Sequence, residues 1–250
     1  MLVRKTIGRA LGALVAPLAF IGSFARGARI FHPDGVVYRA EVLPLAEGGA
    51  LGRLAEQAAG MAIARLSGGI WRWPGSGRRP DVLGVALQFR SAGEPSRPRT
   101  AGDQDLLFIT ARSLWTLPIA PFTTNIDDFL ANEYYAILPF TLEGVGKVEL
   151  RLSPASSAPP GGNRLQRLSR AVERGQAVLR LEARIESKDE AWQPVAAIHL
   201  REQLLLEQDD LPFDPGSAGI GLVPRGVLQS MRPTVYAASQ AGRRLARRLR

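Results

Sequence analysis

The sequence predicts an α+β protein, an antiparallel β-barrel of about eight strands with flanking helices. Short segments in which apolar and polar residues alternate recur along the chain, as half-buried strands require. Segments with the helical spacing of apolar residues stand between and after them. Hydrophobic residues make up 46% of the 250 residues, which is enough for one buried core.

The alternating segments are the expected strands. In residues 36–43, Val36 and Tyr38 share one face, while Arg39 and Glu41 lie on the other. The same alternation predicts strands over residues 146–152, 178–185 and 195–200. Strands are also expected over residues 61–66, 82–89 and 105–110.

Three helices are expected inside the chain, over residues 50–59, within residues 123–136 and over residues 165–174, the last being amphipathic. The second would begin at Thr124 or Asn125, which are good N-cap residues. A last helix is expected after Arg232, because Pro233 suits the first helical position. Segments rich in glycine, proline and serine form the expected loops, over residues 71–80, 91–102, 154–163 and 211–226.

The formal net charge of +9 is concentrated at the two ends of the chain. Residues 1–31 carry five basic side chains and no acidic one, and residues 232–250 carry six and none. The remaining 21 basic residues face 23 acidic ones. A nucleic-acid-binding domain usually spreads its basic residues over a folded face, so we expect no nucleic acid partner. Basic termini suit an anionic membrane surface or bound carboxylates, or are solvated tails.

The N-terminal segment contains an apolar stretch, residues 10–24, which is too short for a comfortable membrane span. A secretory signal is one interpretation; we favour a retained helix that packs on the domain or lies on a membrane. The expected organisation is an apolar and basic segment over 1–28, one domain over 29–243 and a basic tail over 244–250. We expect a cytoplasmic protein with peripheral membrane contact.

Several classes of site are excluded by composition. The chain has no cysteine, which excludes disulfides, thiolate nucleophiles, iron–sulfur clusters and cysteine-based zinc sites. It has two histidines, His32 and His199, and neither belongs to a zinc-protease spacing. His199 lies in an expected strand and is interpreted as structural.

Near the C-terminus, Arg232, Tyr236 and Arg243 lie on one face of the expected helix. An arginine one turn from a phenol stabilises the phenolate. Tyrosinate is an axial ligand of haem iron, and arginine matches the geometry of a porphyrin propionate. The bland interpretation is an ordinary amphipathic helix in which Tyr236 belongs to the core.

Near the N-terminus, His32 follows Arg29 by three residues and precedes Pro33, which favours an extended backbone at His32. A histidine at the entry of a strand can act as a general base near neutral pH. The bland interpretation is a structural or surface histidine.

Taken together, these residues resemble the haem catalases, in a reduced form similar to the small catalase-related peroxidases and the allene oxide synthase-like domains. Six segments carry the resemblance in the same order, namely Arg29-x-x-His32-x-x-Gly35, Ala64-Arg65-Leu66-Ser67, Asp81 to Phe89, Gly102 to Leu107, Phe213-Asp214-Pro215, and Arg232-x-x-x-Tyr236 followed by Arg243.

The resemblance implies a catalase-like barrel that binds haem b, with Tyr236 as the tyrosinate ligand of the iron and Arg232 lowering the pKa of Tyr236. It implies that His32 is the distal base and that Ser67 orients His32. The cations that would pair with the haem propionates are Arg29, Arg65 and Arg243.

One departure concerns the distal asparagine of the family, whose position falls near Thr110. Thr110 is therefore the candidate at that position, and Asn125 is the nearest later asparagine. Without the asparagine, the oxidation of a second peroxide should suffer first, so classical catalase activity should be weak. The chain also lacks room for the long N-terminal arm and C-terminal helical domain of full-size catalases, which implies a more open haem and larger substrates.

We therefore expect a haem peroxidase that reduces hydrogen peroxide or an organic or lipid hydroperoxide. A lipid-hydroperoxide dehydratase or isomerase of the allene oxide synthase kind would share the same haem geometry. Two non-enzymatic interpretations also fit the sequence, a non-catalytic haem or lipid carrier and a haem-free membrane-associated barrel. The reducing co-substrate is open, and so is the choice between a monomer and a homo-oligomer.

Overall fold

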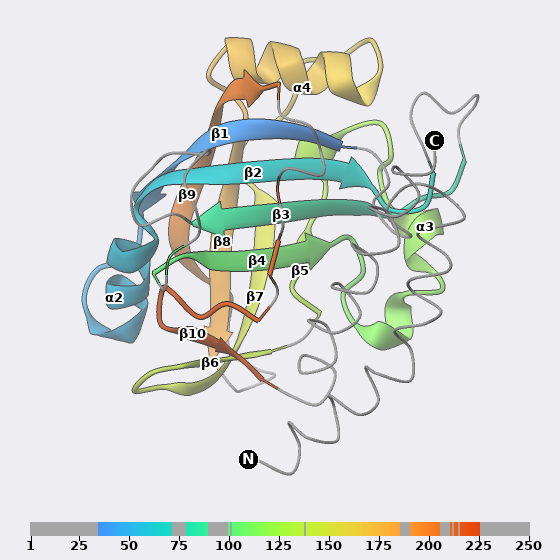
Figure 1. Ribbon diagram of the computed structural model, residues 1–250. Helices are drawn as coiled ribbons and strands as arrows, with labels where there is room; N and C mark the ends of the chain where they lie inside the picture. The colour runs from blue at the N-terminus through green and yellow to red at the C-terminus, as the bar shows by residue number, and fades with distance from the viewer. Residues whose placement is uncertain are drawn as a thin grey trace, which may run out of the picture.

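Ten antiparallel strands form one sheet in the computed structural model, which describes residues 35–71, 79–89, 100, 102–137, 139–185, 191–205, 211, 213–214 and 216–225 (Figure 1). The strands are β1 (Gly35–Pro44), β2 (Gly60–Gly68), β3 (Leu83–Phe89), β4 (Gln104–Ile109), β5 (Tyr134–Tyr135), β6 (Phe140–Leu142), β7 (Gly146–Pro154), β8 (Val178–Ile185), β9 (Gln193–Leu204) and β10 (Leu222–Pro224).

Eight of these strands close into a barrel in the order β7-β5-β4-β3-β2-β1-β9-β8, because β8 also pairs with β7. β6 and β10 extend the sheet beyond β7. The predicted antiparallel barrel of about eight strands is therefore confirmed.

Two helices of ten residues connect neighbouring strands, α2 (Gly49–Ala58) between β1 and β2 and α4 (Arg164–Glu173) between β7 and β8. α4 begins at Asn163, whose side chain accepts the amides of Leu165 and Gln166, while Gln166 completes a capping box. Three shorter helical turns lie between β4 and β5, namely η1 (Leu114–Thr116), α3 (Ala120–Thr123) and η2 (Phe129–Ala131).

Side chains fill the interior of the barrel. Alternate residues of the strands point inward, including the fully buried Tyr38, Leu66, Leu87 and Phe108. α2 and α4 bury their apolar residues against the same cluster. A barrel of eight strands has an interior just wide enough for its own side chains, so a large ligand has to bind outside it.

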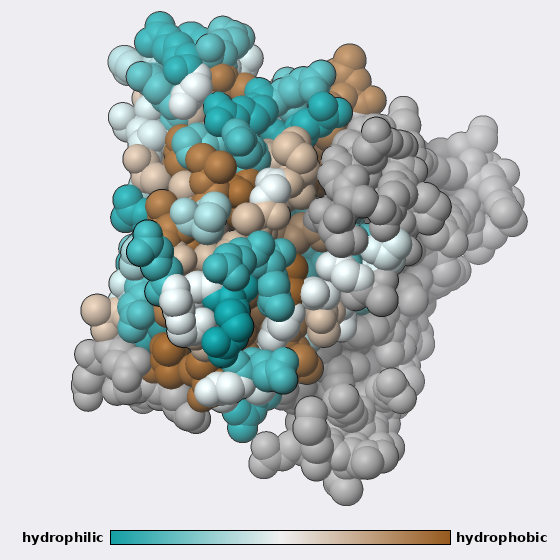
Figure 2. All heavy atoms as spheres, turned by 90° about the vertical axis from the view of Figure 1, so that its left-hand side faces the viewer, coloured by the Kyte–Doolittle hydropathy of each residue, from teal (hydrophilic) through white to brown (hydrophobic). Residues whose placement is uncertain are grey.

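The outside of the molecule is mixed in polarity. Figure 2 shows the side on which α2 lies, where hydrophilic and hydrophobic residues alternate, with hydrophilic residues gathered at the top near α4. Among the described residues, no helix combines the length and the apolar character needed to cross a membrane.

The predicted strands and the helices at 50–59 and 165–174 are confirmed to within a few residues. The helix predicted within residues 123–136, beginning at Thr124 or Asn125, is wrong, because α3 ends at Thr123 and the next helical segment is the three-residue η2. Side chains compete there for the backbone groups that a helix would use: Asn132 donates to the carbonyls of Asn125 and Asp128, and Asp128 accepts the amide of Leu130. The last helix predicted after Arg232 lies outside the described residues.

Candidate functional site

The outward-facing side chains of β1 to β4 form a wall that differs from the rest of the barrel's exterior. Pairing places its residues in transverse rows, the first of which runs from Gly35 through Ser67 and Gly84 to Ile109. We call this surface the outer wall, and it comprises Gly35, Val37, Ile63, Arg65, Ser67, Gly84, Ala86, Gln88, Asp105, Leu107 and Ile109.

Two polar residues of β2 are buried on this wall. Arg65 and Ser67 are each 2% exposed, although outward positions of a barrel normally face water. They lie two residues apart on one strand, so both side chains point away from the barrel interior. Arginine is seldom fully buried in proteins, which makes this position a candidate for a functional role.

The wall around Arg65 is built from small residues. Arg65 pairs with Val37 and Ala86, and the adjoining row contains Gly35, Ser67 and Gly84. A Cβ on Gly35 would lie 2.9 Å from Cζ of Arg65 and 2.6 Å from the carbonyl oxygen of Leu66. The glycine at position 35 therefore leaves room for the guanidinium at the start of β1.

The segment that precedes β10 crosses the outer wall, as Figure 1 shows in front of β3 and β4. Asp105 accepts the amide of Asp214 and the side-chain amide of Gln88, the latter at 3.1 Å. Ser217 Oγ accepts the amide of Asp105 at 2.7 Å. Leu211 and Phe213 pack in one cluster with Val37 and Ile63, which stand on the adjacent strands β1 and β2 of the wall.

Segments far apart in the sequence therefore meet on one surface. Gly35 pairs with Ser67, Ser67 pairs with Gly84, and β3 pairs with β4, whose Asp105 binds the segment at Asp214. These residues belong to five of the six segments on which the resemblance to catalases rests. The resemblance rests on the order of these segments along the chain, and the strand pairing adds that five of them lie side by side.

Thr110 lies one residue beyond β4 and forms three hydrogen bonds. Its amide donates to the carbonyl of Leu83 at 3.0 Å, and its hydroxyl accepts the amide of Leu83 at 3.1 Å. The same hydroxyl shares a hydrogen bond of 2.7 Å with Thr124. Thr110 thus fastens both ends of the segment 110–124 to the start of β3.

Asp81 stands at the entry of β3 and is 2% exposed. Its Oδ1 accepts the amides of Ile70 and Val82, each at 2.8 Å. Burial raises the pKa of Asp81 above its ordinary value, and the hydrogen bonds from Ile70 and Val82 oppose the rise. Asp81 therefore holds together the two ends of the connection between β2 and β3.

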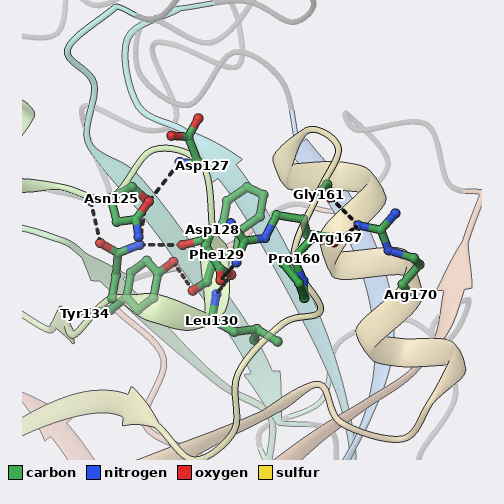
Figure 3. A network of polar contacts seen from close by, with 11 residues as sticks. Asn125, Asp127, Asp128, Phe129, Leu130, Tyr134, Pro160, Gly161, Arg167 and Arg170 are labelled. Carbon is green, nitrogen blue, oxygen red and sulfur yellow. Dashed lines mark hydrogen bonds and ion pairs between the residues drawn. The ribbon is translucent and has the colours of Figure 1, made fainter.

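A second polar network joins the segment before β5 to α4, and the sequence did not reveal it (Figure 3). Arg167 of α4 pairs with the buried Asp128 at 2.7 Å. Tyr134 donates its hydroxyl to the carbonyl of Phe129 at 2.6 Å, and burial raises the pKa of Tyr134. These groups bind one another and the local backbone inside the fold, so we assign the network a structural role.

The remaining predicted site residues lie outside the described residues, namely Arg29, His32, Arg232, Tyr236 and Arg243. Among the residues that the structure describes, no group of three or more histidine, aspartate or glutamate side chains could hold a metal ion. The described part of the site therefore consists of the outer wall with Arg65 and Ser67.

Comparison with solved structures finds a similar fold. The chain matches the structure of a bacterial catalase with a TM-score of 0.60 and 14% sequence identity, over 86% of this chain and 57% of that one. It thus spans little more than half the length of that catalase. No protein-family model matches, and no curated protein matches. At this identity the likeness concerns the fold, and the prediction of a catalase-like barrel with flanking helices is confirmed.

Proposed function

We propose that the chain binds haem b on the outer wall and uses it to reduce peroxides. The observation that carries the proposal is the pair of buried polar residues, Arg65 and Ser67, on an exterior surface whose neighbouring positions are glycine, alanine and aliphatic residues. A surface of small apolar residues accepts a flat macrocycle, and a cation in it matches the carboxylates at the edge of the ring.

Arg65 fits the role of a propionate partner. Its guanidinium lies against Gly35 on a wall with 2% exposure, where water does not screen its charge. Guanidinium forms two parallel hydrogen bonds with a carboxylate, which fixes orientation as well as charge. In this proposal Arg29 and Arg243 are the other propionate partners, and their assignment rests on the resemblance to the haem catalases.

Ser67 fits the role of orienting His32. It pairs in register with Gly35, which follows His32 by only three residues. Covalent geometry therefore limits the distance between the Cα atoms of His32 and Gly35 to about 11 Å at most. A serine hydroxyl can accept the N–H of an imidazole, and Ser67 Oγ itself donates weakly to the carbonyl of Gly84 at 3.5 Å.

The chemistry at the site is the reduction of a hydroperoxide to water and an alcohol, or to two waters for hydrogen peroxide. When bound, haem would supply the iron chemistry for cleavage of the O–O bond. His32 takes the proton from the peroxide and returns it to the leaving oxygen. Tyr236 would hold the iron as tyrosinate, and the charge of Arg232, one helical turn away in the expected helix, would favour that ionised form. A reducing co-substrate provides the two electrons and two protons.

The proposal is tested by visible absorption of the full chain loaded with haem, before and after addition of peroxide. We expect a Soret band that Tyr236→Phe abolishes or shifts, because that variant lacks the phenolate oxygen. His32→Ala should keep the band and react at least about a hundredfold more slowly with peroxide. His199→Ala is the matched control, since His199 lies half-buried on β9, and its rate should equal that of the wild type.

Wild-type spectra and rates in both Tyr236→Phe and His32→Ala would overturn the assignment of these residues. Haem uptake with no reaction after peroxide would favour a haem carrier. Product analysis with a fatty-acid hydroperoxide separates the two enzyme classes, because an allene oxide synthase-like enzyme needs no reducing co-substrate.

A further inference from the structure

The connection between β4 and β5 exposes an unusual number of large apolar side chains. Trp115 is 92% exposed and Phe122 is 76% exposed. Ile119, Leu114 and Leu117 are 58%, 45% and 36% exposed. These five residues lie within nine positions of the chain, and we call the segment Leu114–Phe122 the apolar projection. Single exposed apolar residues are common on proteins, whereas a contiguous group marks a contact surface.

The apolar projection is a preformed structure. η1 and α3 form it, and Figure 1 shows α3 at the side of the barrel away from α2. Successive turns are joined by backbone hydrogen bonds from Ile119 to Thr116 and from Phe122 to Ile119. Its base is closed by the hydrogen bond between Thr110 and Thr124. The exposed side chains are therefore held outward by an ordered backbone, and their exposure does not depend on a partner.

Charge distinguishes between the occupants of this surface. From residue 111 to residue 126 the only charged side chain is Arg112, and the segment has no acidic residue. The whole chain carries a net charge of +9. An anionic lipid surface would attract a chain of net positive charge, whereas a second copy carries the same sign of charge and offers no such attraction.

The residue types agree with a lipid surface. Tryptophan prefers the interface between water and the acyl chains, and phenylalanine, leucine and isoleucine gain free energy by leaving water. A short segment with apolar side chains on its outer side and no acidic group can enter the headgroup region without desolvating a negative charge.

We propose that the apolar projection inserts into the surface of an anionic lipid bilayer and so attaches the protein to it. The attachment involves neither Arg65 nor Ser67, and it goes beyond the proposed haem chemistry. It would bring the proposed haem site close to lipid hydroperoxides. The insertion itself does not require haem, so the two proposals succeed or fail separately.

The test is sedimentation of the full chain with vesicles of phosphatidylcholine alone or with 30% phosphatidylglycerol. The buffer contains about 0.1 M salt, which screens electrostatic attraction between charges more than about 10 Å apart. We expect binding to the anionic vesicles and much weaker binding to the neutral ones. The double variant Trp115→Ser and Phe122→Ser should lower the partition coefficient by about tenfold or more, because two large side chains no longer enter the bilayer. Both residues are exposed, so the variant should keep the circular dichroism spectrum of the wild type.

Leu205→Ser is the matched control, since Leu205 is 95% exposed at the end of β9, outside the projection, and should bind as the wild type does. Equal binding of the double variant and the wild type would overturn the proposal, because the basic termini would then suffice. An absence of wild-type binding would overturn it as well. The proposal would also be overturned if the wild type formed a dimer in analytical ultracentrifugation and the double variant did not. That result would identify a second copy of the chain as the occupant.

Discussion

Asp81 shows how one side chain couples packing to the protonation of the protein. Its carboxylate is buried and accepts two amides at the base of the connection between β2 and β3. Removal from water disfavours the charged form and outweighs those hydrogen bonds, so the pKa of Asp81 is raised. The native state therefore holds the Asp81 proton to a higher pH than the unfolded chain does.

This shift gives a stability prediction with a definite sign. As pH rises from the unfolded pKa of about 3.9 through the raised native pKa, ionisation of Asp81 lowers the free energy of unfolding. Asp81→Asn should remove that component of the pH dependence and still accept the two amides. Asp81→Ala should lose about 1 to 3 kcal/mol, because the amides of Ile70 and Val82 lose their acceptor.

Urea unfolding from pH 4 to pH 8 measures the free energy of unfolding of the wild type, Asp81→Asn and Asp81→Ala. The difference between wild type and Asp81→Asn isolates the Asp81 contribution from those of other carboxylates. Parallel stability curves for these two proteins would contradict the raised pKa.

The close contacts at Gly35 predict the stability of a variant with a side chain there. A methyl group there meets the carbonyl of Leu66 at 2.6 Å and the guanidinium of Arg65 at 2.9 Å, so either the backbone or Arg65 has to move. Gly35→Ala should lower the free energy of unfolding by about 1 to 3 kcal/mol. Chemical denaturation measures this, and a variant as stable as the wild type would show that the start of β1 lies further from Arg65.

At the scale of elements, the sequence predicts best where apolar periodicity is long and regular. The segments at 36–43 and 178–185 alternate along their length, and both are strands. β5, β6 and β10 have three residues or fewer, too few for a period to show. The segment 123–136 has good cap residues at its start, but Asp128 and Asn132 bind local backbone groups and Arg167, which only the folded chain brings near.

The segment that crosses the outer wall depends on Asp105. The carboxylate accepts the amide of Asp214 and the side chain of Gln88, and it is 1% exposed. Asp105→Ala should release residues 211–217 from β4, with a loss of about 2 to 4 kcal/mol, because charge-assisted hydrogen bonds are lost and buried donors remain. Hydrogen exchange should accelerate over residues 211–217.

The control is Asp214→Ala, which keeps the backbone amide that Asp105 accepts and changes only a side chain that binds the amide of Gly216. Exchange over 211–217 should stay slower in this variant than in Asp105→Ala. Equal acceleration in the two would mean that Asp105 does not hold the segment.

At the scale of the whole molecule, closure of the barrel decides where a ligand can bind. The interior is filled by side chains of all eight strands, and the exterior of β1 to β4 holds Arg65 and Ser67. The sequence predicts that Arg65 and Ser67 lie on the same face of one strand, because they are two residues apart. It did not predict the row from Gly35 to Ile109, since strand register depends on the closed barrel.

The most direct test of the account is titration of the full chain with hemin, followed by the Soret band, for the wild type, Arg65→Met and Arg180→Met. Arg180 is the matched control, because it stands on β8, outside the outer wall, with 43% side-chain exposure. Arg65→Met keeps much of the side-chain length and removes the charge, so thermal unfolding should confirm a folded barrel. We expect Arg65→Met to weaken hemin binding by about 10- to 100-fold, as the loss of a charge-assisted pair implies, and Arg180→Met to leave it unchanged. Equal affinities of the folded Arg65→Met variant and the wild type, or no saturable Soret change in the wild type, would contradict a haem site on the outer wall.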